Sequence, residues 1–308
     1  MANITLPKNY KLSDYTIDKK ISSGGFSIVY LGYTKEGAPV AIKEYFPNTI
    51  NLRSKGQVIS FNNMRDKHKF NVGLKAFREE MEIVSKLKHK NIIEITNYFE
   101  TNGTAYIVMP YEYGMGLNRY ISQRGFLEEK DVINIMIGIC SAISLLHDHN
   151  IVHLDLKPGN IWLRPNKEAL ILDFGTARII SENEEEIKKN PPMFTPGYAA
   201  PEQHKEFFAP EFIGYWTDLY GLGTTLYSLL QNKSLTPANI LIQENKKIEI
   251  VKDKYGIYSK DLLEIVEDLT KIEMVDRKKI NLNKIIEKLY SIKVKNINLN
   301  IFDNLKFQ

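Results

Sequence analysis

The residues best suited to chemistry lie in one short run, residues 153–160, which read HLDLKPGN. A carboxylate, Asp155, is followed five residues later by a carboxamide, Asn160. On a single loop, two side chains at this spacing can face the same phosphate from two sides. A second carboxylate, Asp173, opens a DFG tripeptide 13 residues after Asn160. A lone DFG is common by chance, but at this distance from the loop it indicates a phosphate-handling site.

Other segments accompany this run in a fixed order. They are VAIK at 40–43, HLDLKPGN at 153–160, DFG at 173–175 and TPGYAAPE at 195–202. With them, the chain from about residue 15 to residue 290 resembles the eukaryotic-like protein kinase family. The segments KEYFP, NGTAY and YAAPEQ, which start at residues 43, 102 and 198, are similar to bacterial serine/threonine kinases.

The resemblance implies transfer of the γ-phosphoryl group of Mg-ATP to serine or threonine hydroxyls of a protein substrate. Asp155 would accept the proton of the attacking hydroxyl, and Lys157 would offset charge on the transferring group. A lysine two residues after the base is the serine/threonine-type pattern. Asn160 and Asp173 would hold Mg²⁺.

Lys43, the last residue of VAIK, is expected to hold the α- and β-phosphates and to pair with a glutamate on the following helix. Glu79 and Glu80 are adjacent, so only one of them can face inward. Glu80 lies three or four residues from Phe77 and Val84 on the apolar stripe, whereas Glu79 lies off it. The spacing therefore favours Glu80.

The nucleotide loop is the weakest match to the family. Residues 21–29, ISSGGFSIV, resemble G-x-G-x-x-G-x-V, but Ser22 and Ser27 replace the first and third glycines. Glycine suits such a loop because backbone amides must approach phosphates closely. The residues that keep it flexible and cap it are Gly24, Gly25 and Phe26. We expect a working but stiffer lid.

The resemblance also assigns an adenine pocket. Its residues are Ile21, Val29, Ala41, Met109, Pro110, Glu112 and Trp162. Hinge hydrogen bonds should come from the Pro110 carbonyl and the Glu112 backbone, since proline offers only an acceptor. Trp162 is larger than the usual leucine, so we expect its indole to stack on adenine.

The arginine of the family's H-R-D motif is Leu154 here. That arginine normally pairs with a phosphate on the activation segment and so orders it. Ser181, before the acidic residues 182–186, and Thr176 are the only other hydroxyl residues between Asp173 and Thr195. We therefore expect activity without phosphorylation at the usual place.

Three readings of the function remain open. The first is the serine/threonine kinase, and the second is a pseudokinase that binds nucleotide as a scaffold, which the altered glycine loop would support. The third is a small-molecule phosphotransferase, which would lack the 195–202 segment. Such a protein would also lack the expected ion pair between Glu202 and Arg277, which fastens that segment. Asp218 is expected to bind backbone amides of the catalytic loop.

The elements that position these residues change in type along the chain. Strands are predicted over residues 15–17, 28–33, 39–43, 92–99 and 105–109, with a hairpin turn at 100–103. One helix, from about residue 73 to residue 88, interrupts them. Later, helices are predicted over residues 128–147, 218–230, 260–272 and 282–292.

This order predicts an α+β, bilobal protein kinase-like fold. A small β-sheet lobe with one main helix (about 15–110) precedes a hinge (about 110–116) and a larger, mainly helical lobe (about 117–290). Residues 291–308 are expected to form a C-terminal tail. Residues 47–72 read as a polar, solvated insertion, although basic residues such as Arg53 and Lys55 leave a docking surface open.

Composition restricts the protein class. The chain has 308 residues, a formal net charge of +4 and one cysteine, Cys140. The small charge gives no reason to expect a nucleic-acid partner, and no apolar stretch predicts membrane insertion. A single cysteine fits a reducing compartment, so the cytoplasm is expected, with export as an effector still possible. Cys140 should be a buried core thiol. The sequence leaves the oligomeric state open.

Overall fold

The computed structural model describes residues 5–50, 52–54, 57–180, 193–207, 209–246, 248 and 257–305. The chain divides into two compact units. Unit 1 comprises Met1–Lys88 and Ile93–Tyr113, and unit 2 comprises His89–Ile92 and Gly114–Gln308.

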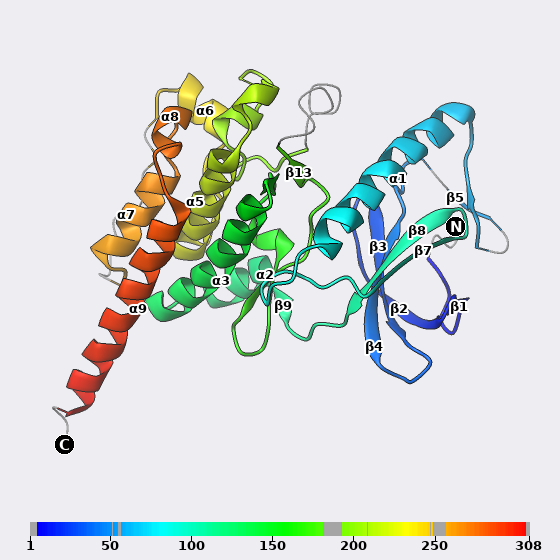
Figure 1. Cartoon of the computed structure of the whole chain (residues 1–308), viewed down its shortest axis with the longest axis horizontal. Helices are drawn as coiled ribbons and strands as arrows, with labels where there is room; N and C mark the ends of the chain where they lie inside the picture. Colours follow the sequence, from blue (N-terminus) through cyan, green and yellow to red (C-terminus); the bar gives the residue numbers. More distant parts are fainter. Residues whose placement is uncertain are drawn as a thin grey trace. The chain divides into compact units, whose positions relative to one another are not determined.

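Unit 1 is built on a six-stranded sheet with the strand order β1-β2-β3-β4-β8-β7 (Figure 1). Its strands are β1 (Lys11–Leu12), β2 (Tyr15–Ser23), β3 (Ser27–Tyr33), β4 (Pro39–Tyr45), β7 (Asn97–Thr101) and β8 (Thr104–Pro110). All neighbouring strands are antiparallel. The β7–β8 hairpin turns at Asn102 and Gly103, both with positive φ, as the sequence predicts.

Burial alternates along β4, as expected for a strand with one face on the core. Val40, Ile42 and Glu44 are buried, while Ala41 and Lys43 point to the opposite, less buried face. The central strand thus presents Lys43 on one face of the sheet and an acidic side chain, Glu44, to the core on the other.

Helix α1 (Met64–Ser85) contacts β8 within unit 1. It begins nine residues before the predicted start at Gly73, because Asn63 caps it by accepting a hydrogen bond from the Asp66 amide at 2.8 Å. Gly73 misled the prediction. It lies inside the helix, where the Tyr45 hydroxyl fills the space that a side chain would need.

The predicted insertion, residues 47–72, is therefore only partly a solvated loop. Its last part is α1, and a short hairpin of β5 (Leu52–Arg53) and β6 (Ile59–Ser60) precedes it. Arg53 and Phe70 are buried, so the expectation of a solvated or docking Arg53 is wrong. Lys55 lies outside the described residues.

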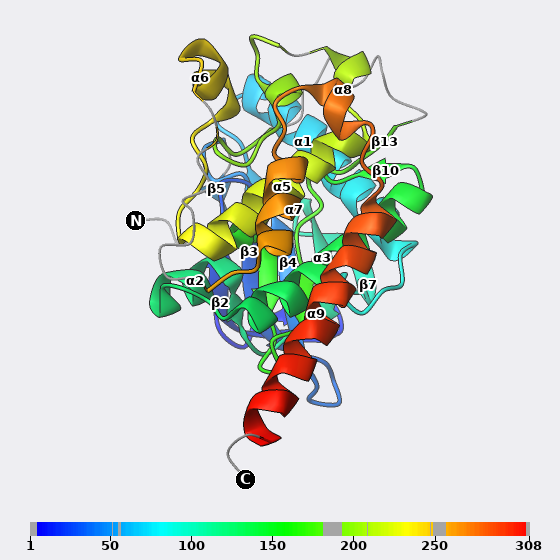
Figure 2. The same cartoon turned by 90° about the vertical axis from the view of Figure 1, so that its left-hand side faces the viewer.

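Unit 2 is mainly helical (Figure 2). Its helices are α2 (Leu117–Arg124), α3 (Glu129–Asp148), α5 (Tyr215–Gln231), α6 (Ala238–Gln243), α7 (Lys260–Leu269), α8 (Met274–Arg277) and α9 (Leu282–Leu305). Helix α5 is buried on all sides from Thr217 to Leu230 and contacts α3 and α7, while α9 packs on α3. Burial on all sides is typical of such a central position, although α5 also buries polar residues such as Asp218 and Thr224.

Short strands in unit 2 hold the loops between the helices. They are β9 (Met115–Gly116), β10 (Ile151–Val152), β11 (Ile161–Leu163), β12 (Ala169–Ile171) and β13 (Arg178–Ile179). Strand β11 pairs with both β12 and β9, and β10 pairs with β13. Short 3-10 turns lie at Pro158–Asn160, Pro201–Gln203 and Pro210–Phe212.

Other predicted boundaries were wrong as well. The strand predicted over residues 92–99 begins only at Asn97, and Ile92 instead forms an isolated bridge with Ile171 of unit 2. The last helix, predicted to end at residue 292, continues as α9 to Leu305. Residues 291–305 of the expected tail are thus helical.

Helix α3 carries the only cysteine. By length and composition α3 could cross a membrane, although the sequence shows no fully apolar stretch, but most of it is buried among the helices of unit 2. A core helix gives the same signal. Cys140 is fully buried, and burial raises the pKa of its thiol to about 12, so the predicted core thiol is confirmed.

Candidate active site

A buried carboxylate fixes the loop between β10 and the 3-10 turn Pro158–Asn160. Asp218, in the first turn of α5, accepts hydrogen bonds from the amides of His153 (2.9 Å) and Leu154 (2.9 Å). Leu154 has φ +67°, a conformation that a leucine rarely adopts. Its carbonyl accepts a hydrogen bond from Gln203 Nε2 at 2.7 Å. The loop is therefore held in a strained shape by contacts from two other segments.

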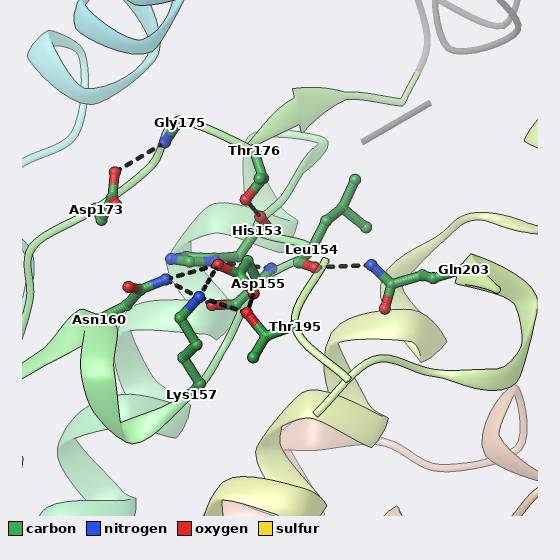
Figure 3. A network of polar contacts seen from close by, with 10 residues as sticks. All are labelled: His153, Leu154, Asp155, Lys157, Asn160, Asp173, Gly175, Thr176, Thr195 and Gln203. Atoms are coloured by element: carbon green, nitrogen blue, oxygen red, sulfur yellow. Dashed lines mark hydrogen bonds and ion pairs between the residues drawn. The ribbon is translucent and has the colours of Figure 1, made fainter. Parts of the chain in front are cut away.

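Asp155 lies at the centre of the polar contacts that this loop makes (Figure 3). Lys157 Nζ lies 2.5 Å from Asp155 Oδ2, and the Thr195 hydroxyl donates to Asp155 Oδ1 at 2.8 Å. Asn160 Nδ2 donates to the Asp155 carbonyl at 2.8 Å and to Oδ2 at 3.0 Å. The carboxylate thus receives a hydroxyl on one oxygen and an amide and an ammonium group on the other.

Asn160 and Asp173 are brought to one side of Asp155. Strand β11, which directly follows Asn160, pairs with β12, which precedes Asp173. The Leu172 amide donates to the Asn160 carbonyl at 3.0 Å. Figure 3 shows the amide nitrogen of Asn160 turned toward Asp155 and its oxygen turned away. Asp173 Oδ1 accepts from the Gly175 amide at 3.3 Å.

His153 contacts both the Asp155 loop and the DFG segment. It is fully buried, its Nδ1 accepts from the Asp155 amide at 3.3 Å, and its ring contacts Phe174 at 5.2 Å between centroids. Its carbonyl accepts a hydrogen bond from Thr176 Oγ1 at 2.8 Å. Burial lowers the pKa of His153, so the ring is neutral and serves as a structural link between the loop and the DFG segment.

In unit 1, Lys43 of β4 forms an ion pair with Glu80 of α1. Lys43 Nζ lies 2.6 Å from Glu80 Oε1, and both side chains are largely buried. Glu79 instead points outward and pairs with Lys75 at 3.3 Å. Phe77, one turn earlier on the same face of α1 as Glu80, has its ring 5.7 Å from the Lys43 ammonium group. Glu80, on the apolar face of α1, is thus the glutamate that pairs with Lys43, as its spacing from Phe77 and Val84 predicts.

The loop between β2 and β3 is exposed. The Gly24 amide donates to the Ser27 carbonyl at 2.9 Å, which closes a tight turn. The side chains of Ile21 and Phe26 are 40% and 54% exposed. Within the part of the chain that the structure describes, no atom lies within 4 Å of the position that a Cβ would take on Gly24 or Gly25. The loop has the openness that the predicted lid requires.

The other expected adenine contacts of unit 1 follow the sheet register. They are Val29, Ala41, Met109, Pro110 and Glu112. Val29 is the cross-strand partner of Lys43, and Ala41 is that of Met109. Lys43 and Ala41 share one face of β4, so their partners Val29 and Met109 lie on that face as well. Pro110 pairs with Val40 of the other face, and Glu112 follows the end of β8.

Trp162 belongs to unit 2, where it lies in β11 opposite Gly116. A Cβ added to Gly114 would lie 2.8 Å from the indole Nε1 and 2.1 Å from the Leu163 carbonyl oxygen. Gly114, with φ +139°, is therefore required where the chain passes the indole. Stacking of Trp162 on adenine stays a prediction.

The segment after Thr195 is fastened by a buried ion pair. Glu202 and Arg277 are in contact, and both are almost fully buried. Arg277 also donates to the Trp216 carbonyl at 3.1 Å and the Ile272 carbonyl at 2.8 Å, and Thr217 donates to Glu202 at 2.9 Å. With these partners the pair is well satisfied, as a buried ion pair must be.

An apolar cluster stands at the place of the expected arginine. Leu154 is buried with Val152 and Ile213, and Ile180 and Tyr215 pack on the same cluster. In Figure 3 the Leu154 side chain points away from Asp155. Ile180 lies between Asp173 and Thr195, so the first part of the activation segment has an apolar contact with this cluster.

Several supporting residues escaped the sequence reasoning. Gln203 directly follows the APE triplet, and His147 Nε2 lies 3.0 Å from Asp218 Oδ2. A lone polar residue carries no spacing signal, so only the three-dimensional arrangement reveals such contacts. Ser181 and the acidic residues 182–186 lie outside the described residues.

Comparison with known proteins covers nearly the whole chain. The family model described as protein kinase domain matches residues 15–296. Among solved structures, PpkA-294 in its apo form is similar over 94% of this chain and 100% of its own, with a TM-score of 0.80 and 25% sequence identity. The expected bilobal kinase fold therefore agrees with the structural neighbour.

Curated relatives include serine/threonine kinases from distant organisms. A probable myosin light chain kinase of Dictyostelium discoideum is 34% identical over 231 residues, 72% of this chain and 52% of that protein. The serine/threonine-protein kinase PrkC of Bacillus subtilis is 36% identical over 160 residues, 52% of this chain and 24% of that protein. Mouse Nek1 is 29% identical over 279 residues, 88% of this chain and 21% of that protein. The chain thus spans between about a fifth and about half of the length of these relatives.

Proposed function

This chain belongs to the serine/threonine protein kinase family, and on that premise we propose that it transfers the γ-phosphoryl group of ATP to hydroxyl groups of protein substrates. One observation carries the proposal furthest. The Asp155 carboxylate accepts a hydrogen bond from a hydroxyl group, that of Thr195, at 2.8 Å. A carboxylate in this setting has the geometry to accept the proton of an attacking hydroxyl.

The neighbours of Asp155 have separate tasks. Lys157, which contacts both Asp155 and Thr195 at 2.5 Å, would offset negative charge on the phosphoryl group in transfer. Asn160 orients the Asp155 carboxylate through its amide nitrogen. In unit 1, Glu80 would hold the Lys43 ammonium group in place for the α- and β-phosphates.

The donor set suits Mg²⁺. Asn160 commits its nitrogen to Asp155, which turns its oxygen to the other side, and Asp173 supplies a carboxylate. Oxygen ligands of this kind, one or two per site, are what Mg²⁺ uses together with phosphates. When bound, the ion would be held by Asn160 and Asp173 and would neutralise the negative charge that develops during phosphoryl transfer.

The test is transfer of radiolabelled phosphate from ATP to the protein itself or to a generic protein, followed by phosphoamino-acid analysis. We expect label on serine and threonine, and loss of label in Asp173→Ala. A wild-type protein that binds nucleotide but transfers no phosphate would favour the pseudokinase. Transfer to a small molecule alone would favour the third reading.

We further propose that activity does not depend on phosphorylation of the activation segment at the usual place. Leu154 cannot bind a phosphate, and the apolar contact with Ile180 supplies an anchor for the start of the segment. Ser181→Ala should keep the wild-type rate. A loss as large as that of Asp155→Asn would refute the proposal.

A further inference from the structure

The exposed loop between β2 and β3 is tied to residues that follow β4. The last ladder pair of β3 and β4 is Ser27 with Tyr45. Beyond it, the Phe46 amide donates to the Phe26 carbonyl at 2.8 Å, and the Asn48 amide donates to the Gly25 carbonyl at 3.3 Å. The ladder is thus prolonged along one side of the loop.

These tethers count because the loop has little else to hold it. Gly24 and Gly25 are exposed, and no atom of the described residues lies within 4 Å of the place where either would carry a Cβ. Without packing, the position of the loop depends on backbone hydrogen bonds. The tethers are only as firm as the segment that bears Phe46 and Asn48.

A buried ion pair fixes that segment. Arg53 Nη2 lies 2.7 Å from Glu44 Oε2, and the two side chains are 1% and 0% exposed. The Arg53 guanidinium also lies over the Phe46 ring, 4.9 Å from its centroid. Arg53 therefore contacts both Glu44, near the end of β4, and Phe46, whose amide donates to the Phe26 carbonyl.

The charges of this pair are fully satisfied. Glu44 also accepts hydrogen bonds from the Tyr30 hydroxyl at 2.8 Å and the Tyr106 hydroxyl at 2.7 Å, and Arg53 Nη1 donates to the Gln57 carbonyl at 3.0 Å. Burial, with the Glu44 charge beside them, raises the pKa of both tyrosines, so both remain donors. A network complete in this way is stiff.

A second attachment holds the far side of the insertion. The Ile59 amide donates to the Asn102 carbonyl at 2.8 Å, at the tip of the β7–β8 hairpin, and Asn102 Nδ2 donates to the Tyr106 hydroxyl at 3.1 Å. Phe46, Asn48, Arg53 and Ile59, which we call the brace, thus join the loop to the centre and to one end of the sheet.

We propose that the brace positions the 24–26 loop for the phosphates of a nucleoside triphosphate, with Arg53 as its positioning residue. The role in nucleotide binding rests on the proposed kinase function, whereas the mechanical link does not. The link gives a physical reason why a loop with serines at two usual glycine positions can still serve, because its place is set from outside.

The sharpest test removes one tether and leaves every side-chain contact of the brace in place. Asn48 occupies the second position of a turn in which the Ile50 amide donates to the Pro47 carbonyl at 3.3 Å. Proline is favoured at that position, so Asn48→Pro should keep the turn while deleting the amide hydrogen. Asn48→Ala, which keeps the amide, is the matched control.

In Asn48→Pro we expect hydrogen exchange of the Phe46 amide and of residues 22–28 to be about fivefold faster in the nucleotide-free protein, as for loss of one hydrogen bond. The Kd of a fluorescent ATP analogue should rise by a similar factor, while the kcat of phosphoryl transfer changes less than the KM for ATP. Asn48→Ala should match the wild type in all these measurements.

Arg53→Met removes the buried guanidinium of the brace and should also make hydrogen exchange over residues 22–28 faster. Arg53→Lys, which keeps a positive charge, should reverse part of this increase. The matched control is Arg78→Met, because Arg78 forms an exposed ion pair with Glu100 at 2.6 Å in the same unit. If Arg53→Met fails to fold because Glu44 is left unpaired, the double variant Glu44→Gln, Arg53→Met replaces it.

Unchanged exchange over residues 22–28 in both Asn48→Pro and the Arg53 variant would overturn the proposal. Faster exchange with an unchanged Kd would overturn the assigned role in nucleotide binding. If the wild type transfers no phosphate but the variants change both hydrogen exchange and the Kd, the proposed role of the brace is supported and the proposed kinase activity is refuted.

Discussion

At the scale of single residues, the two oxygens of Asp155 are used differently. Oδ1 meets the Thr195 hydroxyl, and Oδ2 meets Lys157 and Asn160. Oδ2 is thereby fixed by groups that stay in place, while Oδ1 faces a hydroxyl. A substrate hydroxyl that approaches Asp155 would meet an oriented acceptor, which is the condition for general-base catalysis.

Asp155→Asn should therefore lower kcat by about 10²–10⁴-fold, the usual contribution of a general base. Asparagine keeps the shape and the contact with Lys157 but cannot take up a proton. Single-turnover phosphoryl transfer measures the loss of rate. The Kd for ATP should stay within about twofold, because Asp155 is not one of the residues expected to hold the phosphates of ATP. A rate close to the wild type would show that another group is the base.

Glu79 and Glu80 of α1 provide a matched pair of variants within unit 1. Glu80→Gln weakens the ion pair with the buried Lys43, whereas Glu79→Gln affects only the exposed contact with Lys75. We expect Glu80→Gln to lower kcat/KM for ATP by about tenfold or more, since hydrogen bonds to charged groups contribute about 1.5–3 kcal/mol. Glu79→Gln should be neutral. Steady-state kinetics of both variants decides, and equal effects would contradict the assignment.

Which residues could be predicted follows from how they are spaced. Asp155, Asn160 and Asp173 lie close together along the chain, so their order alone announces them. Arg53 and Glu44 are nine positions apart in unrelated contexts, and a basic residue in a polar stretch reads as solvated. Only the fold shows that Arg53 is buried. The charge of Glu44 on the core face of β4 was the available signal.

At the scale of elements, α1 shows how a local rule can be overruled. Glycine inside a helix is unfavourable, and Gly73 therefore suggests a boundary. The helix nevertheless continues through Gly73, and a glycine is needed there because the Tyr45 hydroxyl lies 2.0 Å from where a Cβ would be. The first turns of α1 carry few apolar residues besides Phe70, so periodicity gave no sign of them.

Gly73→Ala should consequently destabilise the protein, although alanine is the better helix former by about 1 kcal/mol. The Tyr45 ring is held between Phe70 and Phe77, at centroid distances of 4.9 and 5.6 Å, so it cannot swing aside. Overpacking costs about 1–3 kcal/mol, which outweighs the propensity gain. Urea unfolding measures the change.

Tyr45→Phe is the companion variant, because it removes the hydroxyl and leaves the ring. In that background Gly73→Ala should cost less than in the wild type, a positive coupling between the two sites. Additive effects, or stabilisation by Gly73→Ala alone, would show that the space beside Gly73 is not the reason for the glycine.

At the scale of the whole molecule, the fold class was predictable and the lengths of its parts were not. A run of strands followed by helices predicts an α+β arrangement, and the comparisons support the kinase fold. The late start of β7 goes with a tertiary contact that no local pattern contains, the bridge of Ile92 with Ile171. Past residue 292, helix α9 makes contacts with residues far along the chain, such as the ion pair of Lys295 with Asp261.

Buried histidines should make global stability fall in mild acid. Burial lowers the pKa of His153 and of His204 in the folded protein. Above about pH 6.5 both histidines are neutral in the folded and in the unfolded protein. Below it the unfolded chain binds protons at these sites, whereas the folded protein binds them only at lower pH. Stability is therefore lost as the pH falls through about 6.5 toward the lower, folded-state pKa values.

Urea unfolding at pH 7.5 and 5.5 tests this, with an expected loss of up to about 1.4 kcal/mol per pH unit for each histidine. His153→Asn should reduce the dependence, whereas His68→Asn, an exposed position on α1, should leave it unchanged. An identical pH dependence in both variants would assign the effect to other groups.

Cys140 finally has a practical consequence for work on this protein. Because the only thiol is sealed in α3 with its pKa at about 12, maleimide reagents should leave the native chain unmodified. A cysteine introduced on the surface would then be the one labelling site, ready for a fluorophore or spin probe without first deleting the native residue. Conversely, label appearing on Cys140 itself would count the molecules that have opened their core.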